Sequence, residues 1–158
     1  MYKPKKTKTE MKTGLLSLCC ALMLFASCGK RIPKSDAVAI VPKPVSEQLS
    51  DSTFDLTKRT RIRLLADDST LLRSTDFFNG VVSKAFGKGL YVAQGGQAQK
   101  DAINVRLDDS LPSEGYTLSI TPDSIDIAGG SPAGVFYAFQ SLRQLLPAAA
   151  LAGERARV

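Results

Sequence analysis

The chain has 158 residues, with 21 lysines and arginines against 15 aspartates and glutamates, and it contains no histidine. This length suits one domain and is too short for a separate (β/α)8 barrel, which takes about 250 residues. Without histidine, these residues cannot form a Ser-His-Asp triad, a histidine acid/base pair or a histidine-bearing zinc site. The hydrophobic fraction of 44% also excludes a wholly disordered chain.

Much of the net positive charge belongs to the first 27 residues. Five lysines there precede an apolar run from Gly14 to Ser27, and the segment has a single acid, Glu10. The run is shorter than the roughly 20 residues needed to span a bilayer, and it is typical of the central region of a secretory signal. Residues 28–158 hold 16 basic and 14 acidic groups, so we expect no nucleic-acid partner.

The apolar run ends in Leu24-Phe-Ala-Ser-Cys28, which is similar to the lipobox of bacterial lipoproteins. The resemblance implies a lipoprotein signal peptide over residues 1–27, lipidation of Cys28, and a polar tether over residues 28–39. Two or three acyl chains would anchor the protein stably to a membrane. We therefore expect it in the bacterial cell envelope, on the outer membrane, facing the periplasm or the cell surface. The alternatives are an ordinary signal peptide with a chance cysteine, or a buried core helix.

The first part of the mature chain predicts short strands and one helix. Residues 40–44, Ile-Val-Pro-Lys-Pro, should be extended, because two prolines remove backbone donors and restrict φ. Short strands are expected at residues 54–56 and 61–65. Apolar side chains recur at mostly helical spacing over residues 70–86, and Gly87 follows as a helix terminator.

Three segments with strict apolar–polar alternation come next, over residues 103–108, 116–121 and 124–127. Each presents one apolar and one polar face, which favours antiparallel strands. Thr121-Pro-Asp-Ser124 predicts a tight hairpin between the last two strands, since proline suits the second position of a turn.

A second helix is expected over residues 133–146. Ser131 and Pro132 provide an N-cap and a first-turn proline, and Pro147 stops the helix. Together these elements predict an α+β fold, a two-layer sandwich with a mainly antiparallel sheet and helices packed on one face.

Two groups of residues could bind ions, and for both we prefer a structural interpretation. The junction Gly129-Gly-Ser-Pro132 could cradle a phosphate at a helix start, but its sequence matches neither nucleotide-binding glycine pattern, which favours a turn with a cap. Asp67-Asp68 and Asp108-Asp109 could serve acid/base chemistry or bind Ca²⁺. Adjacent strand residues point to opposite faces, so we interpret both pairs as solvated ends of elements.

Basic and aromatic residues could bind glycans. The densest basic cluster of the mature chain is Lys58, Arg59, Arg61 and Arg63, which could bind an anionic glycan or a lipid headgroup, although a solvated sheet face is the preferred interpretation. Tyr91, Tyr116 and Tyr137 could stack on sugar rings, but apolar surroundings favour core packing for Tyr116 and Tyr137. We predict no catalytic residue, no cofactor site and no metal site from these patterns.

Three motifs together resemble the N-terminal, non-catalytic domain of bacterial β-N-acetylhexosaminidases, glycoside hydrolases of family 20. Residues 40–44 resemble its opening motif, I(I/V)PxP. Residues 114–123, Glu-Gly-Tyr-Thr-Leu-Ser-Ile-Thr-Pro-Asp, resemble its EGYxLxVxPDG hairpin, with Ser124 where glycine is usual. Residues 131–147 resemble its signature helix, xxAGxFYGxQTLxQLL, with Ala138 and Ser141 replacing the usual glycine and threonine.

The resemblance implies an accessory domain over residues 40–147 and, over residues 148–158, the start of a linker to a catalytic barrel absent from the chain. The family removes terminal β-linked N-acetylglucosamine or N-acetylgalactosamine from glycans by substrate-assisted retention. The adjacent Asp-Glu pair of its barrel occurs nowhere in these residues, so the chain is expected to be inactive alone.

The expected partners are the parent's own barrel, N-acetylhexosamine-bearing glycans through that barrel, and a membrane through the lipid anchor. The helical layer should pack against the barrel, with Phe136, Tyr137 and Phe139 as candidates for an uncovered apolar patch. The alternatives are a stand-alone glycan-binding lipoprotein and the N-terminal domain of a different glycosidase, such as one of family 84 or 67.

Overall fold

The computed structural model describes residues 40–146 together with residues 156 and 157. The predicted signal peptide, the lipidation site Cys28 and the tether therefore lie outside the described residues. The same holds for Pro147 and for the predicted linker, apart from its residues 156 and 157.

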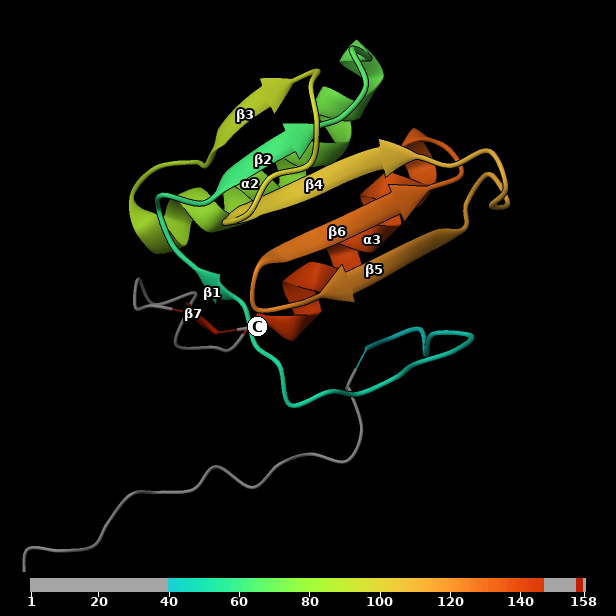
Figure 1. Ribbon diagram of the computed structural model, residues 1–158, viewed down its shortest axis with the longest axis horizontal. Coiled ribbons are helices and arrows are strands. Elements are labelled where there is room, and N and C mark those ends of the chain that lie inside the picture. The colour runs from blue at the N-terminus through green and yellow to red at the C-terminus, as the bar shows by residue number, and fades with distance from the viewer. Residues whose placement is uncertain (1–39, 147–155, 158) are drawn as a thin grey trace, which may run out of the picture. The chain divides into compact units, whose positions relative to one another are not determined.

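Nine elements follow one another along the described chain (Figure 1). In order, they are β1 (Asp55–Leu56), β2 (Arg61–Leu64), α2 (Ser69–Phe86), β3 (Tyr91–Gln94), β4 (Ala102–Leu107), β5 (Tyr116–Ile120), β6 (Ser124–Gly129), α3 (Pro132–Leu145) and β7 (Ala156–Arg157). Residues 40–53 form neither helix nor strand, so the two prolines of residues 40–44 do lie outside regular helix and sheet. Val41 of this segment is bonded to α3: its amide donates to the Gln144 side-chain oxygen at 2.9 Å, and the Gln144 side-chain amide donates to the Val41 carbonyl at 3.1 Å.

The strands form a five-stranded sheet in the order β3-β2-β4-β6-β5, and β1 pairs separately with β7. β2 runs parallel to β3 and β4, and β4 runs parallel to β6. Within this sheet, antiparallel pairing occurs between β5 and β6, joined by the hairpin that Thr121–Ser124 predicted. The prediction of a mainly antiparallel sheet was therefore wrong. Alternation reports which face of a strand is buried. It is commoner in antiparallel sheets but does not fix the direction of a strand, and here three of the four pairings in the five-stranded sheet are parallel.

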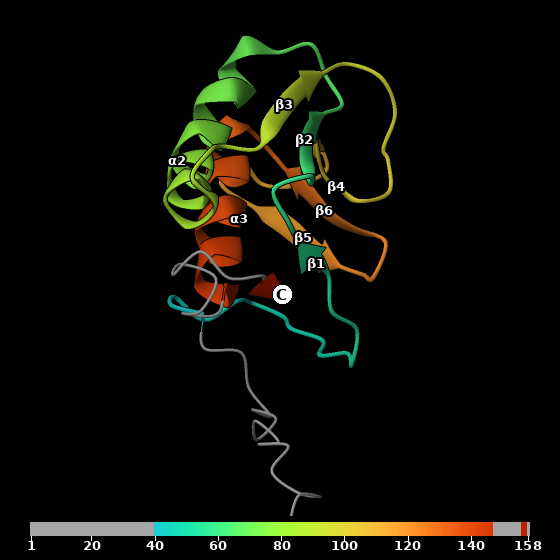
Figure 2. The same ribbon diagram turned by 90° about the vertical axis from the view of Figure 1, so that its left-hand side faces the viewer.

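Both helices cover the same face of the sheet, which confirms the two-layer α+β fold (Figure 2). The core between the layers is built from aliphatic and aromatic side chains of every layer-forming element. Its largest fully buried members are Phe54, Leu56, Ile62, Leu64, Leu71, Phe78, Val82, Ile103, Ile125, Ile127, Phe139 and Leu142. The rings of Phe78 in α2 and Phe139 in α3 lie 5.1 Å apart at the centre of the helix pair.

The helix ends agree with the signals in the sequence. The Asp68 side chain accepts a hydrogen bond from the Thr70 amide at 2.8 Å and so caps α2. Gly87 ends α2 with a left-handed φ of 76°, a conformation that glycine adopts without steric cost. Ser131 caps α3, and its hydroxyl accepts from the Ala133 amide at 3.1 Å.

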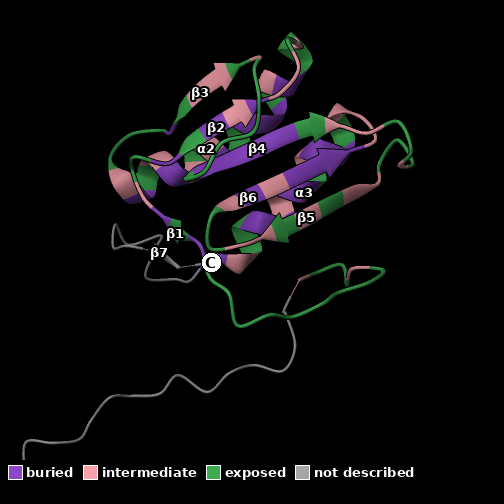
Figure 3. Cartoon of the chain, in the orientation of Figure 1, coloured by how far each residue is buried: buried purple, intermediate pink, exposed green. Residues whose placement is uncertain are grey.

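Two features of the sheet had no counterpart in the sequence prediction. β3 is a short edge strand whose residues are exposed or half-buried, so it shows no apolar alternation. Asn104 belongs to the predicted polar face of the segment 103–108, yet only 3% of its surface is exposed to solvent. It lies under the loop between β3 and β4, where it donates to the Gln99 carbonyl and accepts from the Gln99 amide. The central strands β4 and β6 are accordingly the most buried ones (Figure 3).

Candidate functional site: an aromatic groove on the helical layer

The outer surface of the helical layer carries three aromatic side chains that pack edge to face. The Phe136 ring lies 5.9 Å from the ring of Phe77 in α2 and 5.9 Å from that of its neighbour Tyr137. The Arg143 guanidinium lies 5.7 Å from the centre of the Phe77 ring. Phe77 and Tyr137 remain 42% and 41% exposed. We call Phe77, Phe136 and Tyr137 the aromatic ridge.

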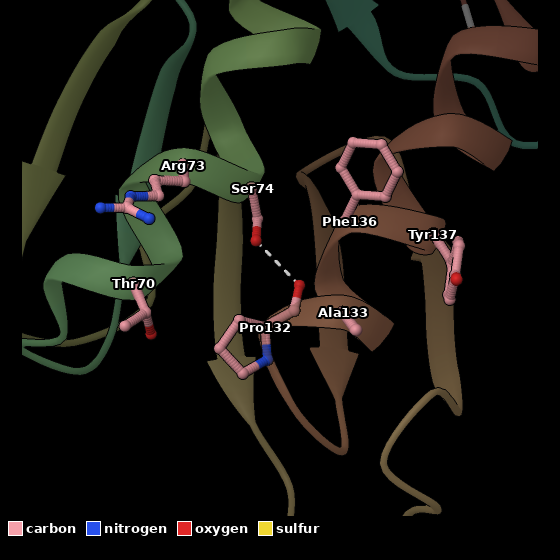
Figure 4. A pocket seen from close by; sticks show the side chains of 7 residues that line it. All are labelled: Thr70, Arg73, Ser74, Pro132, Ala133, Phe136 and Tyr137. Carbon is pink, nitrogen blue, oxygen red and sulfur yellow. Dashed lines mark hydrogen bonds between the residues drawn. The ribbon is translucent and has the colours of Figure 1, made fainter.

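A groove of about 350 Å³ lies beside this ridge, between the first turns of the two helices. Figure 4 shows Ser74 of α2 facing Pro132 of α3 across it, where the serine hydroxyl donates to the proline carbonyl at 2.8 Å. This bond ties the starts of the helices together. The lining residues are Thr70, Arg73, Ser74, Pro132, Ala133, Phe136 and Tyr137. Apart from Arg73, the groove is lined by apolar and neutral polar side chains, which suits a protein surface better than a charged small molecule.

The positions of the α3 aromatics only partly follow the prediction. Phe139 is fully buried and belongs to the core, so its place in an uncovered patch was wrong. Phe136 is half-buried and Tyr137 exposed, as that prediction required. The preferred interpretation of Tyr137 as a core residue was wrong, whereas Tyr116 packs beneath α3 with its hydroxyl 2.6 Å from that of buried Ser141.

The Gly129–Pro132 junction binds the protein's own backbone. The Gly130 amide donates to the Gly115 carbonyl at 2.9 Å, and the Ser131 hydroxyl donates to the Ser113 carbonyl at 2.6 Å. The first free helix amide, that of Ala133, is already capped. A phosphate would have to displace these contacts, so the interpretation as turn and cap holds.

The two aspartate pairs also lie at ends of elements, as interpreted. Asp68 caps α2, and the two bonds from Thr70 lower the pKa of this exposed carboxyl. Asp108 follows β4 and organises the turn before β5, where its backbone carbonyl accepts from the Leu111 amide. In the part of the chain that the structure describes, no three acidic or cysteine side chains gather into a metal site.

The Asp108 carboxyl predicts a pH-dependent stability. The hydroxyl of Ser110, the guanidinium of Arg106 and the Ser110 amide all donate to it and lower its pKa to about 2. Because this pKa lies below that of the unfolded chain, about 3.9, the carboxylate stabilises the fold above pH 4. That contribution is lost as the pH falls from about 4 to about 2.

Urea unfolding at pH 5 and pH 2.5 tests this. We expect the native chain to lose more stability between the two pH values than Asp108→Asn does. The neighbouring Asp109→Asn is the control, because the Asp109 carboxylate makes no hydrogen bond to a described residue, and it should keep the native difference. Equal losses in the native chain and Asp108→Asn would contradict the prediction.

The basic cluster of the mature chain is split by the structure. Arg61 and Arg63 share the outer face of β2, but they differ in exposure to solvent. Arg63 is half-buried and donates to the Gly95 carbonyl at 3.0 Å, beneath the loop that follows β3. Arg61 is exposed and lies 5.9 Å from the ring centre of Tyr91, itself 68% exposed. Lys58 and Arg59 are exposed in the turn before β2.

None of these groups forms a catalytic arrangement. The described residues that line the groove between the helices include one charged side chain, that of Arg73, and no carboxylate. Along the described residues, no helix has the length and apolar character required to cross a membrane.

Comparison with known proteins identifies similar chains. The family model "Glycosyl hydrolase family 20, domain 2" matches residues 37–157. A beta-hexosaminidase of Porphyromonas gingivalis is 31% identical over 138 residues, which is 83% of this chain and 18% of that protein. The chain thus spans about a fifth of the length of this curated relative.

Solved structures give the same result. The GH20 beta-N-acetylhexosaminidase of Streptomyces coelicolor A3(2) matches 73% of this chain and 24% of its own, with 28% identity and a TM-score of 0.64. A mutant beta-hexosaminidase of Streptomyces plicatus in complex with the product GlcNAc matches 70% of this chain and 22% of its own, with 30% identity and a TM-score of 0.62. The chain belongs to glycosyl hydrolase family 20, as a member of its non-catalytic domain 2.

Proposed function

We propose that the chain is the accessory domain of a β-N-acetylhexosaminidase that removes terminal β-linked N-acetylglucosamine or N-acetylgalactosamine from glycans. In this proposal the chain binds no substrate at a catalytic centre of its own. Its helical layer packs against the catalytic barrel of the same protein. The observation that carries the proposal is the exposed aromatic ridge of Phe77, Phe136 and Tyr137 on a chain of this family.

Physical reasons favour a protein surface as the occupant of the ridge. Aromatic rings that already pack edge to face bury a large apolar area for a small loss of side-chain entropy when a partner covers them. The groove beside them is open and largely apolar, so side chains of a second domain could enter it. A flanking cation, Arg143, is already held over the Phe77 ring and could remain solvated at the rim of such an interface.

The first experiment measures hydrolysis of a chromogenic N-acetyl-β-glucosaminide. It compares the 158-residue chain with a longer protein in which the reading frame continues beyond Val158. We expect the longer protein alone to cleave the substrate, because the Asp-Glu pair that the resemblance requires is absent from these residues. Hydrolysis by the shorter chain would overturn the proposal. Glycan binding without hydrolysis in both proteins would favour the stand-alone glycan-binding alternative.

The second experiment tests the interface. The double substitution Phe136→Ala/Tyr137→Ala should lower the Tm of the longer protein by at least about 4 °C more than it lowers that of the 158-residue chain. Tyr91→Ala removes a tyrosine from the opposite face of the sheet and serves as the control, with similar shifts in both proteins. Similar shifts for the double variant as well would mean that the ridge contacts no second domain.

We also propose that Cys28 carries the lipid anchor of an envelope lipoprotein, attached to the outer membrane and facing the periplasm or the cell surface. The lipobox-like motif and the lysine-rich start of the chain support this. Cys28→Ser should move the protein from the membrane fraction to the soluble fraction in cell fractionation. A variant that stays in the membrane fraction with its signal peptide cleaved would exclude lipidation at this position.

A further inference from the structure

Four exposed basic residues lie at the end of the sheet where β2 and β3 begin, the end at which β3 starts with Tyr91. Lys58 and Arg59 lie in the turn before β2, Arg61 begins β2, and Lys88 lies in the loop before β3. β2 and β3 are parallel neighbours, so the segments that lead into the two strands lie at the same end of the sheet (Figure 1). All four basic side chains are exposed. We call these four residues and Tyr91 the basic patch.

The backbone that presents the patch is held by specific hydrogen bonds. In the turn before β2, the Thr60 amide donates to the Thr57 carbonyl at 3.0 Å, and the Thr57 amide donates to the Thr60 hydroxyl at 3.1 Å. Thr60 itself is 2% exposed. The patch is therefore presented by a fixed turn, which lowers the entropic cost of binding a ligand there.

The loop before β3 is held equally well by Asn79 of α2. Its side chain accepts from the Leu90 amide at 2.6 Å and donates to the Leu90 carbonyl at 3.0 Å. Gly89 passes so close that an added Cβ would come within 2.9 Å of the Asn79 side chain. Lys88 and Tyr91 consequently flank a segment whose position is determined by α2.

Arg61 and Tyr91 form the centre of the patch. They are direct partners in the β2–β3 ladder, so their side chains leave the sheet on the same face. The Arg61 guanidinium lies 5.9 Å from the centre of the Tyr91 ring, a cation–π distance. Tyr91 nevertheless stays 68% exposed, which leaves the ring available to a ligand beside the guanidinium.

Charge is segregated along the sheet. Residues 40–146 hold 11 basic and 12 acidic side chains, so the patch is not a consequence of a basic domain. Five acids lie near the opposite end, where β2 and β4 end and β5 begins: Asp67, Asp68, Asp108, Asp109 and Glu114. No basic residue of the patch forms an ion pair with a described residue.

Acidic residues also lie near this end of the sheet. Asp55 belongs to β1, three residues before Lys58, and two further acids are Asp101 and Asp123. They precede β4 and β6, on the other side of β2 from β3, and Asp123 is paired with Lys100 at 2.9 Å. Asp101, which forms no ion pair with a described residue, adjoins Arg61 across the β2–β4 ladder. The four basic side chains of the patch thus form no ion pair with a described acid. This arrangement attracts an anion to a surface that also exposes an aromatic ring.

We propose that the basic patch binds an anionic glycan, one that carries sulfate or carboxylate groups on its sugar rings. Arg61, the turn residues Lys58 and Arg59, and Lys88 in the loop before β3 would bind the acidic groups. Tyr91 would stack on the apolar face of one sugar. The proposal concerns the sheet face opposite the aromatic ridge, and it does not depend on the proposed hexosaminidase function.

The observations favour a glycan over other polyanions. The patch is a few residues wide and has one exposed ring, whereas nucleic-acid surfaces combine longer basic stripes with several stacking residues. A membrane headgroup layer would engage the lysines and arginines without needing an exposed tyrosine beside Arg61. Tyr91 and Arg61 together match a ligand that is both cyclic and charged.

The test is calorimetric titration of the 158-residue chain with a sulfated chondroitin hexasaccharide at low salt. Arg61→Gln should weaken binding at least about tenfold, and Tyr91→Ala should weaken it severalfold. Arg106→Gln and Tyr137→Ala are the matched controls, because Arg106 is paired with Asp108 and Tyr137 lies on the helical layer; both should bind as the native chain does. Thermal unfolding of every variant verifies that it is folded.

Three further ligands separate the proposal from its alternatives. Neutral chitohexaose should not bind, and polyphosphate, a polyanion without sugar rings, should bind weakly and without dependence on Tyr91. If polyphosphate binds as tightly as the glycan, or if Tyr91→Ala binds the glycan like the native chain, the patch is a general polyanion surface and the proposal fails. Tighter binding to vesicles of anionic phospholipid than to the hexasaccharide would assign the patch to a membrane surface instead.

Discussion

Gly134→Ala is expected to lower the free energy of unfolding of the chain by about 3 kcal/mol. Gly134 lies in the first turn of α3, against the loop that leads into β5. An added Cβ would come within 2.3 Å of the Gly115 carbonyl oxygen, an atom of the backbone that cannot rotate away. The loop is itself bonded to the start of α3 through the Gly130 amide and the Ser131 hydroxyl. Relief of the clash would therefore break contacts on both sides.

Gly80 provides the matched control. It is also a helical glycine, in α2, but an added Cβ there meets nothing within 4 Å. Gly80→Ala should raise the free energy of unfolding by about 0.5–1 kcal/mol, because alanine loses less backbone entropy than glycine in a helix. The two substitutions are chemically identical, so the difference in sign comes from the surroundings of the helix.

Urea unfolding followed by circular dichroism measures both changes. The m-value should stay constant, so that the shift in midpoint reports stability alone. A neutral or stabilising Gly134→Ala would mean that α3 and the loop into β5 can separate without cost. The close packing at the helix start would then not contribute to the stability of the fold.

Phe139→Ala should destabilise the chain by about 3–5 kcal/mol. The Phe139 ring is fully buried and lies 5.1 Å from that of Phe78, which is also fully buried. Its removal leaves a cavity between α3, α2 and the sheet, and the rigid neighbours cannot collapse into it completely. This contact joins the two helices in the core, so its loss should weaken the whole helical layer.

Tyr137→Ala, two residues away, serves as the comparison. The Tyr137 side chain is 41% exposed and contacts Phe136 on the surface, so its loss should cost less than about 1 kcal/mol in the chain alone. The same unfolding measurement distinguishes the two. If both substitutions cost the same, the division of the α3 aromatics into a core residue and a surface residue would be incorrect.

The sequence by itself determined most local structure and the family. The period of the apolar residues located both long helices, and Ser131 and Gly87 marked their ends to within one residue. These signals are reliable because they depend on groups that are neighbours along the chain: a cap bonds an amide two residues away, and a helical stripe repeats within a few turns. The resemblance carried by the residues around Gly134 likewise indicated family 20, to which the chain belongs.

The tertiary structure alone decided strand direction, the faces of the aromatic residues and the basic patch. Alternation in β4 is the same whether its neighbour β6 runs parallel or antiparallel, and only the path of the chain between them, through β5, selects the parallel arrangement. Phe136, Tyr137 and Phe139 lie close together in α3, so the orientation of the helix about its own axis decides which of the three rings faces the core and which faces solvent. Arg61 and Tyr91 are 30 residues apart in the sequence, and they become neighbours because β3, an edge strand without an apolar pattern, pairs with β2. Such pairings depend on contacts between distant segments, which no local pattern records.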